Sequence, residues 1–167
     1  ESLCVSTQVG CAVGCTFCMT GTMGLVRQLG SPEIVAQVAL ARQQRAVNKV
    51  VFMGMGEPAH NLDNVMDAIE LLGKEGGIGH KQLVLSTVGD VRVFDRLEAL
   101  PASAVKPALA LSLHTTNAER RRALLPRALQ LGQLFAPPGF ERGEGGFLYG
   151  HRLQLPLQDL ETGLDGT

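Results

Sequence analysis

The sequence predicts an α/β fold, a partial (β/α) barrel of about four βα units. Two observations carry this prediction. Strand-like and helix-like segments alternate from the first residue to about residue 125, and such alternation is typical of a parallel sheet with right-handed crossovers. The chain has 167 residues, whereas a closed eight-fold barrel typically takes about 250. An open or partial barrel therefore fits the length.

The first elements follow from apolar runs and a helix-start pattern. Residues 3–7 predict a short strand that runs into a cysteine-rich loop. The segment SPE at 31–33 predicts a helix start, because it offers a serine cap, a proline in the first position and an acid in the first turn. The run KVVFM at 49–53 predicts a buried strand. Apolar residues with helical spacing predict a helix over 64–74.

The same alternation continues over the next two units. Strands are expected at 83–85 and 108–113, and helices at 91–100 and 117–125. Beyond residue 126 the segments APPG and GEGG break any regular pattern. The sequence therefore predicts a core over 1–126 and a divergent, irregular tail over 127–167.

Composition excludes several classes of protein. Apolar residues make up 45% of the chain and charged residues 19%, which is typical of a folded globular domain. The net charge is −1 and aromatic residues are 4%, so neither charge nor stacking side chains point to a nucleic-acid surface. The one dense basic run, Arg120-Arg121-Arg122, is interpreted as a solvated helix face.

Localisation and completeness follow from the absence of other signals. The sequence holds no run of 18 apolar residues and no secretory leader, so we expect no membrane segment and a cytoplasmic location. We also expect a monomer. The chain starts at Glu1 rather than methionine, and we expect it to be a fragment of a longer protein.

The four cysteines are crowded into the first eighteen residues. Cys11, Cys15 and Cys18 form a C-x3-C-x2-C run, and thiolates are soft ligands suited to iron–sulfur clusters and zinc. Three thiolates on one short loop can ligate three irons of a cubane and leave the fourth iron open. An open iron is what a cluster needs if a small molecule is to coordinate it.

Two alternatives remain beside the cluster. Structural zinc takes four ligands with closed tetrahedral geometry, and a fourth ligand here would be Cys4 or a distant histidine. The cysteines could also be small buried core residues, although glycines punctuate the run. We rank the cluster ahead of zinc, and zinc ahead of the core residues.

Polar residues follow each of the predicted strands. Gly54-Met-Gly-Glu-Pro58 follows the second strand, a Ser-Thr pair at 86–87 ends the third, and Ser112-Leu-His114 ends the fourth. Barrel-like folds carry their active sites at the carboxyl ends of strands. We therefore expect the cysteines, a glutamate, hydroxyl groups and a histidine to meet on one face.

These motifs resemble the RlmN/Cfr family of radical-SAM adenosine methyltransferases, nearer the RlmN branch. The resemblance covers about residues 1–126. It rests on the sequence from Cys4 to Cys18, Gly54 to Pro58, LSTVG at 85–89 and SLH at 112–114.

The resemblance implies a [4Fe–4S] cluster and S-adenosylmethionine (SAM) as cofactors. It also implies methylation of carbon 2 of adenosine in 23S ribosomal RNA and in transfer RNA, with an electron donor such as flavodoxin. By position, the metal ligands are Cys11, Cys15 and Cys18. The implied SAM-binding residues are Gly56, Glu57, Ser86, Ser112, Leu113 and His114.

Two SAM molecules serve the reaction that the resemblance implies, and a cysteine near the C-terminus carries the methyl group. Cys4 matches a second cysteine that resolves the covalent adduct through a transient disulfide, and a buried strand residue is the alternative for Cys4. No cysteine follows Cys18, so we expect this chain not to complete methyl transfer. The remaining alternatives are a radical-SAM enzyme with another substrate and a non-catalytic protein that binds the cluster or SAM.

Overall fold

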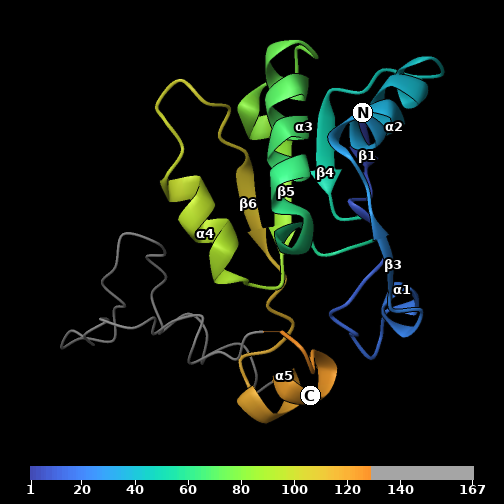
Figure 1. The fold of residues 1–167 in the computed structure, drawn as a ribbon, viewed down its shortest axis with the longest axis vertical. Coiled ribbons are helices and arrows are strands. Elements are labelled where there is room, and N and C mark those ends of the chain that lie inside the picture. Colours follow the sequence, from blue (N-terminus) through green and yellow to red (C-terminus); the bar gives the residue numbers. More distant parts are fainter. Residues whose placement is uncertain (129–167) are drawn as a thin grey trace, which may run out of the picture.

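A computed structural model describes residues 1–128 of the chain (Figure 1). The predicted tail lies outside the described residues except for positions 127 and 128. The strands are β1 (Ser2–Cys4), β2 (Gln8–Gly10), β3 (Leu25–Gln28), β4 (Lys49–Phe52), β5 (Leu83–Thr87) and β6 (Ala108–Leu111). The α-helices are α1 (Met19–Thr22), α2 (Ser31–Arg42), α3 (Leu62–Lys74), α4 (Val91–Glu98) and α5 (Ala118–Leu124), and 3-10 turns cover Pro58–Asn61 and His80–Gln82.

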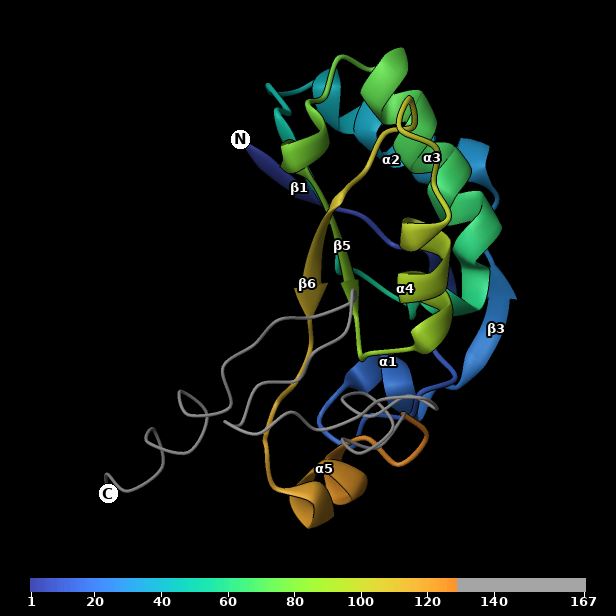
Figure 2. The ribbon, with the colours of Figure 1, turned by 90° about the vertical axis from the view of Figure 1, so that its left-hand side faces the viewer.

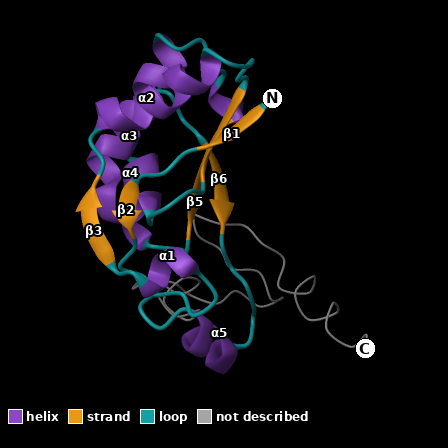
Figure 3. Ribbon diagram, turned by 90° about the vertical axis from the view of Figure 1, so that its right-hand side faces the viewer, coloured by secondary structure: helices purple, strands orange, loops and turns teal. Residues whose placement is uncertain are grey.

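Four strands form one parallel sheet in the order β1-β4-β5-β6. Val50 lies opposite Leu3 on one side and Leu83 on the other, and Leu109 continues the sheet opposite Leu85. Helices α2, α3 and α4 lie on one face of this sheet (Figures 2 and 3). The predicted α/β partial barrel is confirmed, because the four strands of this sheet are parallel and helices lie between successive strands along the chain.

The core lies between the sheet and these helices. Its fully buried side chains come from strands and helices alike, and each contributes about 1.5–3 kcal/mol by leaving water. They include Val50, Phe52, Leu83 and Leu85 from the sheet, and Ile34, Val38, Val65, Ile69, Leu72 and Val93 from the helices. The carboxyl ends of β5 and β6 point away from this core toward α1 and α5 (Figure 2).

Helices α2 and α5 begin close to the residues where the sequence predicts helix starts. Helix α2 starts at Ser31, but Gly30 occupies the cap position, and Glu33 accepts a 2.9 Å hydrogen bond from the Gly30 N–H. Ser31 is therefore the first helical residue rather than the cap. Asn117 caps α5 by accepting from the Arg120 N–H at 2.9 Å.

Within the described residues no helix is long and apolar enough to cross a membrane.

An antiparallel ribbon of β2 and β3 lies outside the parallel sheet. The strand expected over 3–7 ends at Cys4, and the ribbon strand β2 begins at Gln8. The sequence missed β3, because all four of its residues are exposed and show no apolar alternation. The ribbon matters for function because the cysteine loop leaves from its β2 end.

The interpretation of the arginine run as a solvated face is wrong for its central residue. Arg120 and Arg122 are exposed, but Arg121 is 0% exposed. Its guanidinium donates to the main-chain carbonyls of Val88, Ser112 and Leu113. A charge that donates to several oxygens can be buried, and this pairing comes from tertiary structure that a local sequence pattern does not contain.

Candidate functional site

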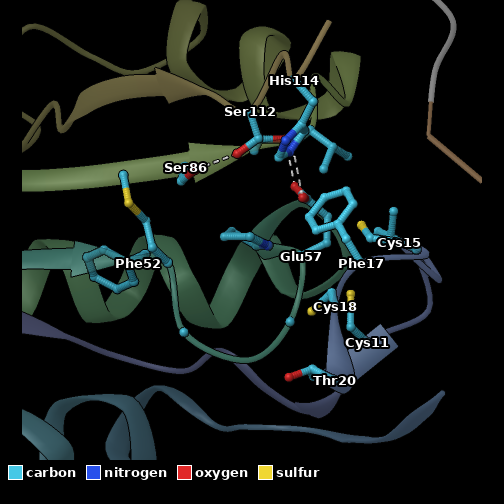
Figure 4. Close-up of a pocket in the computed structure, with 17 residues that line it drawn as sticks. Cys11, Cys15, Phe17, Cys18, Thr20, Phe52, Glu57, Ser86, Ser112 and His114 are labelled. Atoms are coloured by element: carbon cyan, nitrogen blue, oxygen red, sulfur yellow. Dashed lines mark hydrogen bonds between the residues drawn. The ribbon is translucent and has the colours of Figure 1, made fainter. Parts of the chain in front are cut away.

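A cavity of about 250 Å³ lies at the carboxyl ends of the parallel strands (Figure 4). Four separate segments line it: the cysteine loop (residues 11–18) with the start of α1, the end of β4 with the turn after it, the end of β5 with the residue after it, and the segment after β6. The lining residues are Cys11, Val13, Cys15, Phe17, Cys18, Thr20, Phe52, Met53, Gly54, Gly56, Glu57, Pro58, Ser86, Thr87, Val88, Ser112 and His114. Segments far apart in the sequence thus meet as the sequence predicts.

The cysteine loop is held by main-chain hydrogen bonds at both ends. The Cys11 N–H donates to the Gly24 carbonyl at 3.0 Å, which fixes the loop to the start of β3. The Cys18 N–H donates to the Cys15 carbonyl at 3.1 Å, which closes the loop into a turn. The three cysteine side chains lie together at one side of the cavity (Figure 4).

This donor set fits a cubane cluster. Among the described residues, no three His, Cys, Asp or Glu side chains are placed to hold one metal ion, but a cluster requires only that its cysteines reach different irons. Burial is the main cause that raises the pKa values of the Cys11 and Cys15 thiols. The protons must therefore leave when iron binds, because the thiolate is the ligand.

The turn after β4 fits closely against β2 and the residues before it. A Cβ at Gly54 would lie 2.7 Å from the Val5 carbonyl oxygen. Gly56 has a φ of +105°, and a Cβ there would lie 2.7 Å from the Gln8 side chain. The buried Gln8 amide oxygen accepts the Glu57 N–H at 2.8 Å. Both glycines are therefore needed for the close approach, and Gln8 fixes the turn that carries Glu57.

Met55 joins the same turn to the start of the ribbon through its main chain. Its carbonyl accepts the Thr7 N–H at 2.9 Å and the Gln8 N–H at 3.2 Å. Its own N–H donates to the Ser6 hydroxyl at 3.0 Å. The hydrogen bonds that hold the turn here therefore come from the backbone of Met55, and its side chain is 40% exposed.

The Glu57 carboxylate is almost completely buried at the edge of the cavity. Its Oε1 accepts from the Thr87 hydroxyl at 2.6 Å and from the Ala59 N–H at 3.3 Å, and its Oε2 accepts from the Val88 N–H at 3.1 Å. Burial raises the pKa of Glu57, although these donors act in the opposite direction. A carboxylate oxygen can accept two hydrogen bonds, so Oε2 can accept an ammonium group as well.

Thr87→Val is expected to lower the free energy of unfolding by about 1.5–3 kcal/mol at pH 8. It removes the hydroxyl that donates to the buried Glu57 carboxylate and accepts from the Gly89 and Asp90 N–H groups. Loss of this donor raises the pKa of Glu57 further. The loss of stability that comes from the ionised Glu57 is therefore fully present at pH values above the pKa of Glu57 in the folded protein. It shrinks as the pH falls through that pKa, because the carboxylate becomes protonated. Urea denaturation at pH 8 and pH 5 measures both effects. Thr87→Ser keeps the hydroxyl and should lose only about 1 kcal/mol for its deleted buried methyl group, equally at both pH values. An equal deficit in the two variants would contradict the assignment.

The end of β5 and the segment after β6 place two serines and a histidine beside the cavity. The Ser86 and Ser112 hydroxyl oxygens are 3.2 Å apart, within hydrogen-bond distance (Figure 4). His114 has a φ of 64°, the left-handed region that residues other than glycine seldom adopt. Burial and the charge of Arg121 lower the pKa of His114, which favours the neutral imidazole.

Phe17 extends from the cysteine loop to this histidine. The two ring centroids are 4.8 Å apart with an interplanar angle of 50°. Phe17 is 55% exposed, so the contact with His114 is on the open side of the cavity. The aromatic residue before the third cysteine thus connects the cysteine loop with the segment after β6.

Most of the residues that the sequence singles out line this cavity, but two do not. Leu113 is not a lining residue, and its carbonyl accepts from Arg121 and from the Thr115 N–H at 2.9 Å. Cys4 ends β1 as an exposed residue, not a buried one, and lies outside the cavity lining. Sequence reasoning missed Gln8 and Arg121, because nothing in their local patterns indicates the distant main-chain groups that they bind.

The Radical SAM superfamily profile matches residues 5–129. A probable RNA methyltransferase of Pseudomonas aeruginosa PAO1 is 65% identical over 164 residues, which is 98% of this chain and 45% of the relative. A probable RNA methyltransferase of Methylibium petroleiphilum is 78% identical over 128 residues, which is 77% of this chain and 36% of the relative. This chain thus spans less than half the length of these relatives.

A solved structure shows the same fold. The crystal structure of a radical SAM methyltransferase from Sphaerobacter thermophilus superimposes with a TM-score of 0.69 at 41% sequence identity. The match covers 83% of this chain and 40% of that protein. The similarity is therefore to part of a longer enzyme.

Proposed function

The chain belongs to the radical SAM superfamily, and we propose that it supplies the cluster-binding and SAM-binding part of an RNA methyltransferase that acts on carbon 2 of adenosine. Members of the superfamily use a [4Fe–4S] cluster and SAM. The observation that carries the proposal is the shared cavity. Three cysteines from one loop and polar groups from three strand ends line the same space.

We assign Cys11, Cys15 and Cys18 as ligands of the cluster. When bound, the cluster supplies the electron that cleaves the sulfonium of SAM. Glu57, fixed by Thr87 and Val88, offers a carboxylate oxygen for the ammonium group of SAM.

The remaining assigned groups lie on the next two strands. Ser86 and Ser112 offer hydroxyl groups, and His114 with Phe17 borders the open side. Gly56 permits the close approach of the turn to the Gln8 side chain. The Leu113 carbonyl is held in place by Arg121.

The RNA substrate is supported by the names of the relatives and by the RlmN/Cfr-like motifs. We propose adenosine of 23S ribosomal RNA as the substrate, with transfer RNA as a second one. Cys4 is the proposed resolving cysteine, and its exposed position at the end of β1 leaves the thiol accessible. Its partner cysteine must come from outside this sequence, because none follows Cys18.

The test separates cofactor chemistry from methyl transfer. This chain, reconstituted anaerobically with iron and sulfide and then reduced, is expected to convert SAM to 5′-deoxyadenosine, detected by mass spectrometry. A chimera then replaces the matching segment of the P. aeruginosa relative with residues 1–128 of this chain. With 23S ribosomal RNA and labelled SAM, the chimera is expected to form 2-methyladenosine, and its Cys15→Ala variant none.

Three other outcomes of this test would change the assignment. Deoxyadenosine without any labelled nucleoside would favour a radical SAM enzyme with another substrate. A label on a different nucleoside would keep the RNA methyltransferase and overturn carbon 2 of adenosine. Absence of both products, with the relative active in parallel, would overturn the proposed function.

A further inference from the structure

Arg121 is the one arginine in its run that α5 turns toward the site. Its side chain is completely buried. The guanidinium donates to the Val88 carbonyl at 2.6 Å, to the Leu113 carbonyl and, at 3.4 Å, to the Ser112 carbonyl. These acceptors lie after β5 and after β6, so one side chain joins the two strand ends.

Two of these carbonyls belong to residues that line the cavity, and the third belongs to a residue next to one. The N–H of Val88 donates to Glu57 at 3.1 Å. The hydroxyl of Ser112 is 3.2 Å from that of Ser86. Leu113 immediately precedes His114, whose left-handed backbone must be held by its surroundings.

Helix α5 also contacts the cysteine loop. The Leu124 carbonyl at its end accepts the Thr16 N–H at 3.0 Å, and Arg127 just beyond it donates to the Ala12 carbonyl at 3.0 Å. The helix that carries Arg121 is thus joined to the loop of the three cysteines. Figure 1 shows α5 beyond the carboxyl ends of the strands.

We propose that Arg121 is a positioning residue that fixes the Ser112–His114 segment against Val88 and, through α5, at a set distance from the cysteine loop. The inference rests on the proposed function, because these residues are the groups assigned to bind SAM. Arg121 does not touch the reacting atoms. It acts through the backbone that carries Ser112, His114 and the donor to Glu57.

An arginine is required by the geometry of the acceptors. A guanidinium presents five N–H donors in a rigid planar fork, whereas a lysine ammonium is one compact group on a flexible stem. Arg121→Lys keeps the charge and most of the apolar stem but cannot reach carbonyls of both strand ends in the same way. The variant therefore separates the fork from the charge.

The experiment compares Arg121→Lys with Arg122→Lys, a matched change at the exposed neighbour. Both chains are reconstituted with iron and sulfide, and their iron content, melting temperature and dissociation constant for SAM are measured. Arg121→Lys is expected to bind SAM about ten-fold more weakly, the loss of one hydrogen bond to a charged group. Its iron content should equal that of the wild type, and Arg122→Lys should match the wild type throughout.

A spectroscopic measurement distinguishes a positioning role from a loss of stability, because lower stability alone would not change how the cluster responds to SAM. SAM added to the reduced wild-type cluster is expected to change its electron paramagnetic resonance spectrum. In Arg121→Lys the same change should require more SAM while its final form is kept. A wild-type dissociation constant in Arg121→Lys would overturn the positioning role. An unfolded Arg121→Lys protein would also overturn it, because Arg121 would then serve folding alone.

Failure of the proposed function gives a different result. A wild-type chain that loads no cluster, or whose cluster spectrum ignores SAM, contradicts the proposed function itself. A wild-type chain that shows both properties, beside an unaffected Arg121→Lys, contradicts only the inference about Arg121.

Discussion

Cys15→Ala is expected to abolish loading of the [4Fe–4S] cluster. The change removes one of three thiolates that line the cavity from a single loop, and two thiolates do not hold the cubane against exchange with solvent thiols. Iron and acid-labile sulfide should fall from about four per chain to a small fraction of that content. Formation of 5′-deoxyadenosine from SAM should fall to background.

The fold should survive this substitution. Cys15 is only half-buried, and the main-chain bond from the Cys18 N–H to its carbonyl does not involve the side chain. The melting temperature of the chain without iron should therefore stay near the wild-type value. Cys4→Ala is the matched control, since Cys4 is exposed and outside the cavity, and should load a full cluster. Equal iron contents in the two variants would contradict the ligand assignment.

Gly10→Ala is expected to have the largest effect on stability. The φ of Gly10 is +79°, which costs about 1–2 kcal/mol for a residue with a Cβ. A Cβ there would also lie 1.9 Å from the Gly24 carbonyl oxygen, inside any permitted contact. The ribbon of β2 and β3 must open to relieve this clash. We expect a loss of at least about 3 kcal/mol in the free energy of unfolding.

Gly24→Ala separates the two causes. Gly24 has a similar φ of +68°, but a Cβ there meets nothing within 4 Å. Its cost should be the backbone term alone, about 1–2 kcal/mol. Urea denaturation of both variants measures the difference. Gly10→Ala should also lower cluster loading, because the Cys11 N–H donates to the carbonyl that is displaced. Equal costs in the two variants would contradict the contact argument.

The sequence predicted the parallel sheet and the edge of it, at the carboxyl ends of the strands, where the cavity lies. Buried runs such as KVVFM identify strands by their apolar character alone, and parallel strands bring their carboxyl ends to one edge. The positions of Glu57, Ser86 and Ser112 at the cavity follow directly from that rule. Local patterns were sufficient there, because each residue only had to stand at the end of a strand.

Residues that act through distant contacts were not predictable in this way. Strand β3 is exposed along its length and is recognisable only from its hydrogen bonds with β2. Gln8 and Arg121 are polar residues whose burial depends on carbonyl and amide groups remote in sequence. The energy that buries them comes from tertiary pairing, so a local sequence window carries no sign of it.

The turn from Gly54 to Gly56 has a consequence for how variation in this sequence should be interpreted. Its middle residue makes its hydrogen bonds through main-chain groups, so any residue type with a main-chain N–H can make them at position 55. Proline is the exception, because the Met55 N–H is used by Ser6. A change from glycine at either flank, in contrast, would introduce atoms where backbone or Gln8 already lies. A substitution of Gly54 or Gly56 is therefore a stronger sign of a remodelled site than a substitution at position 55.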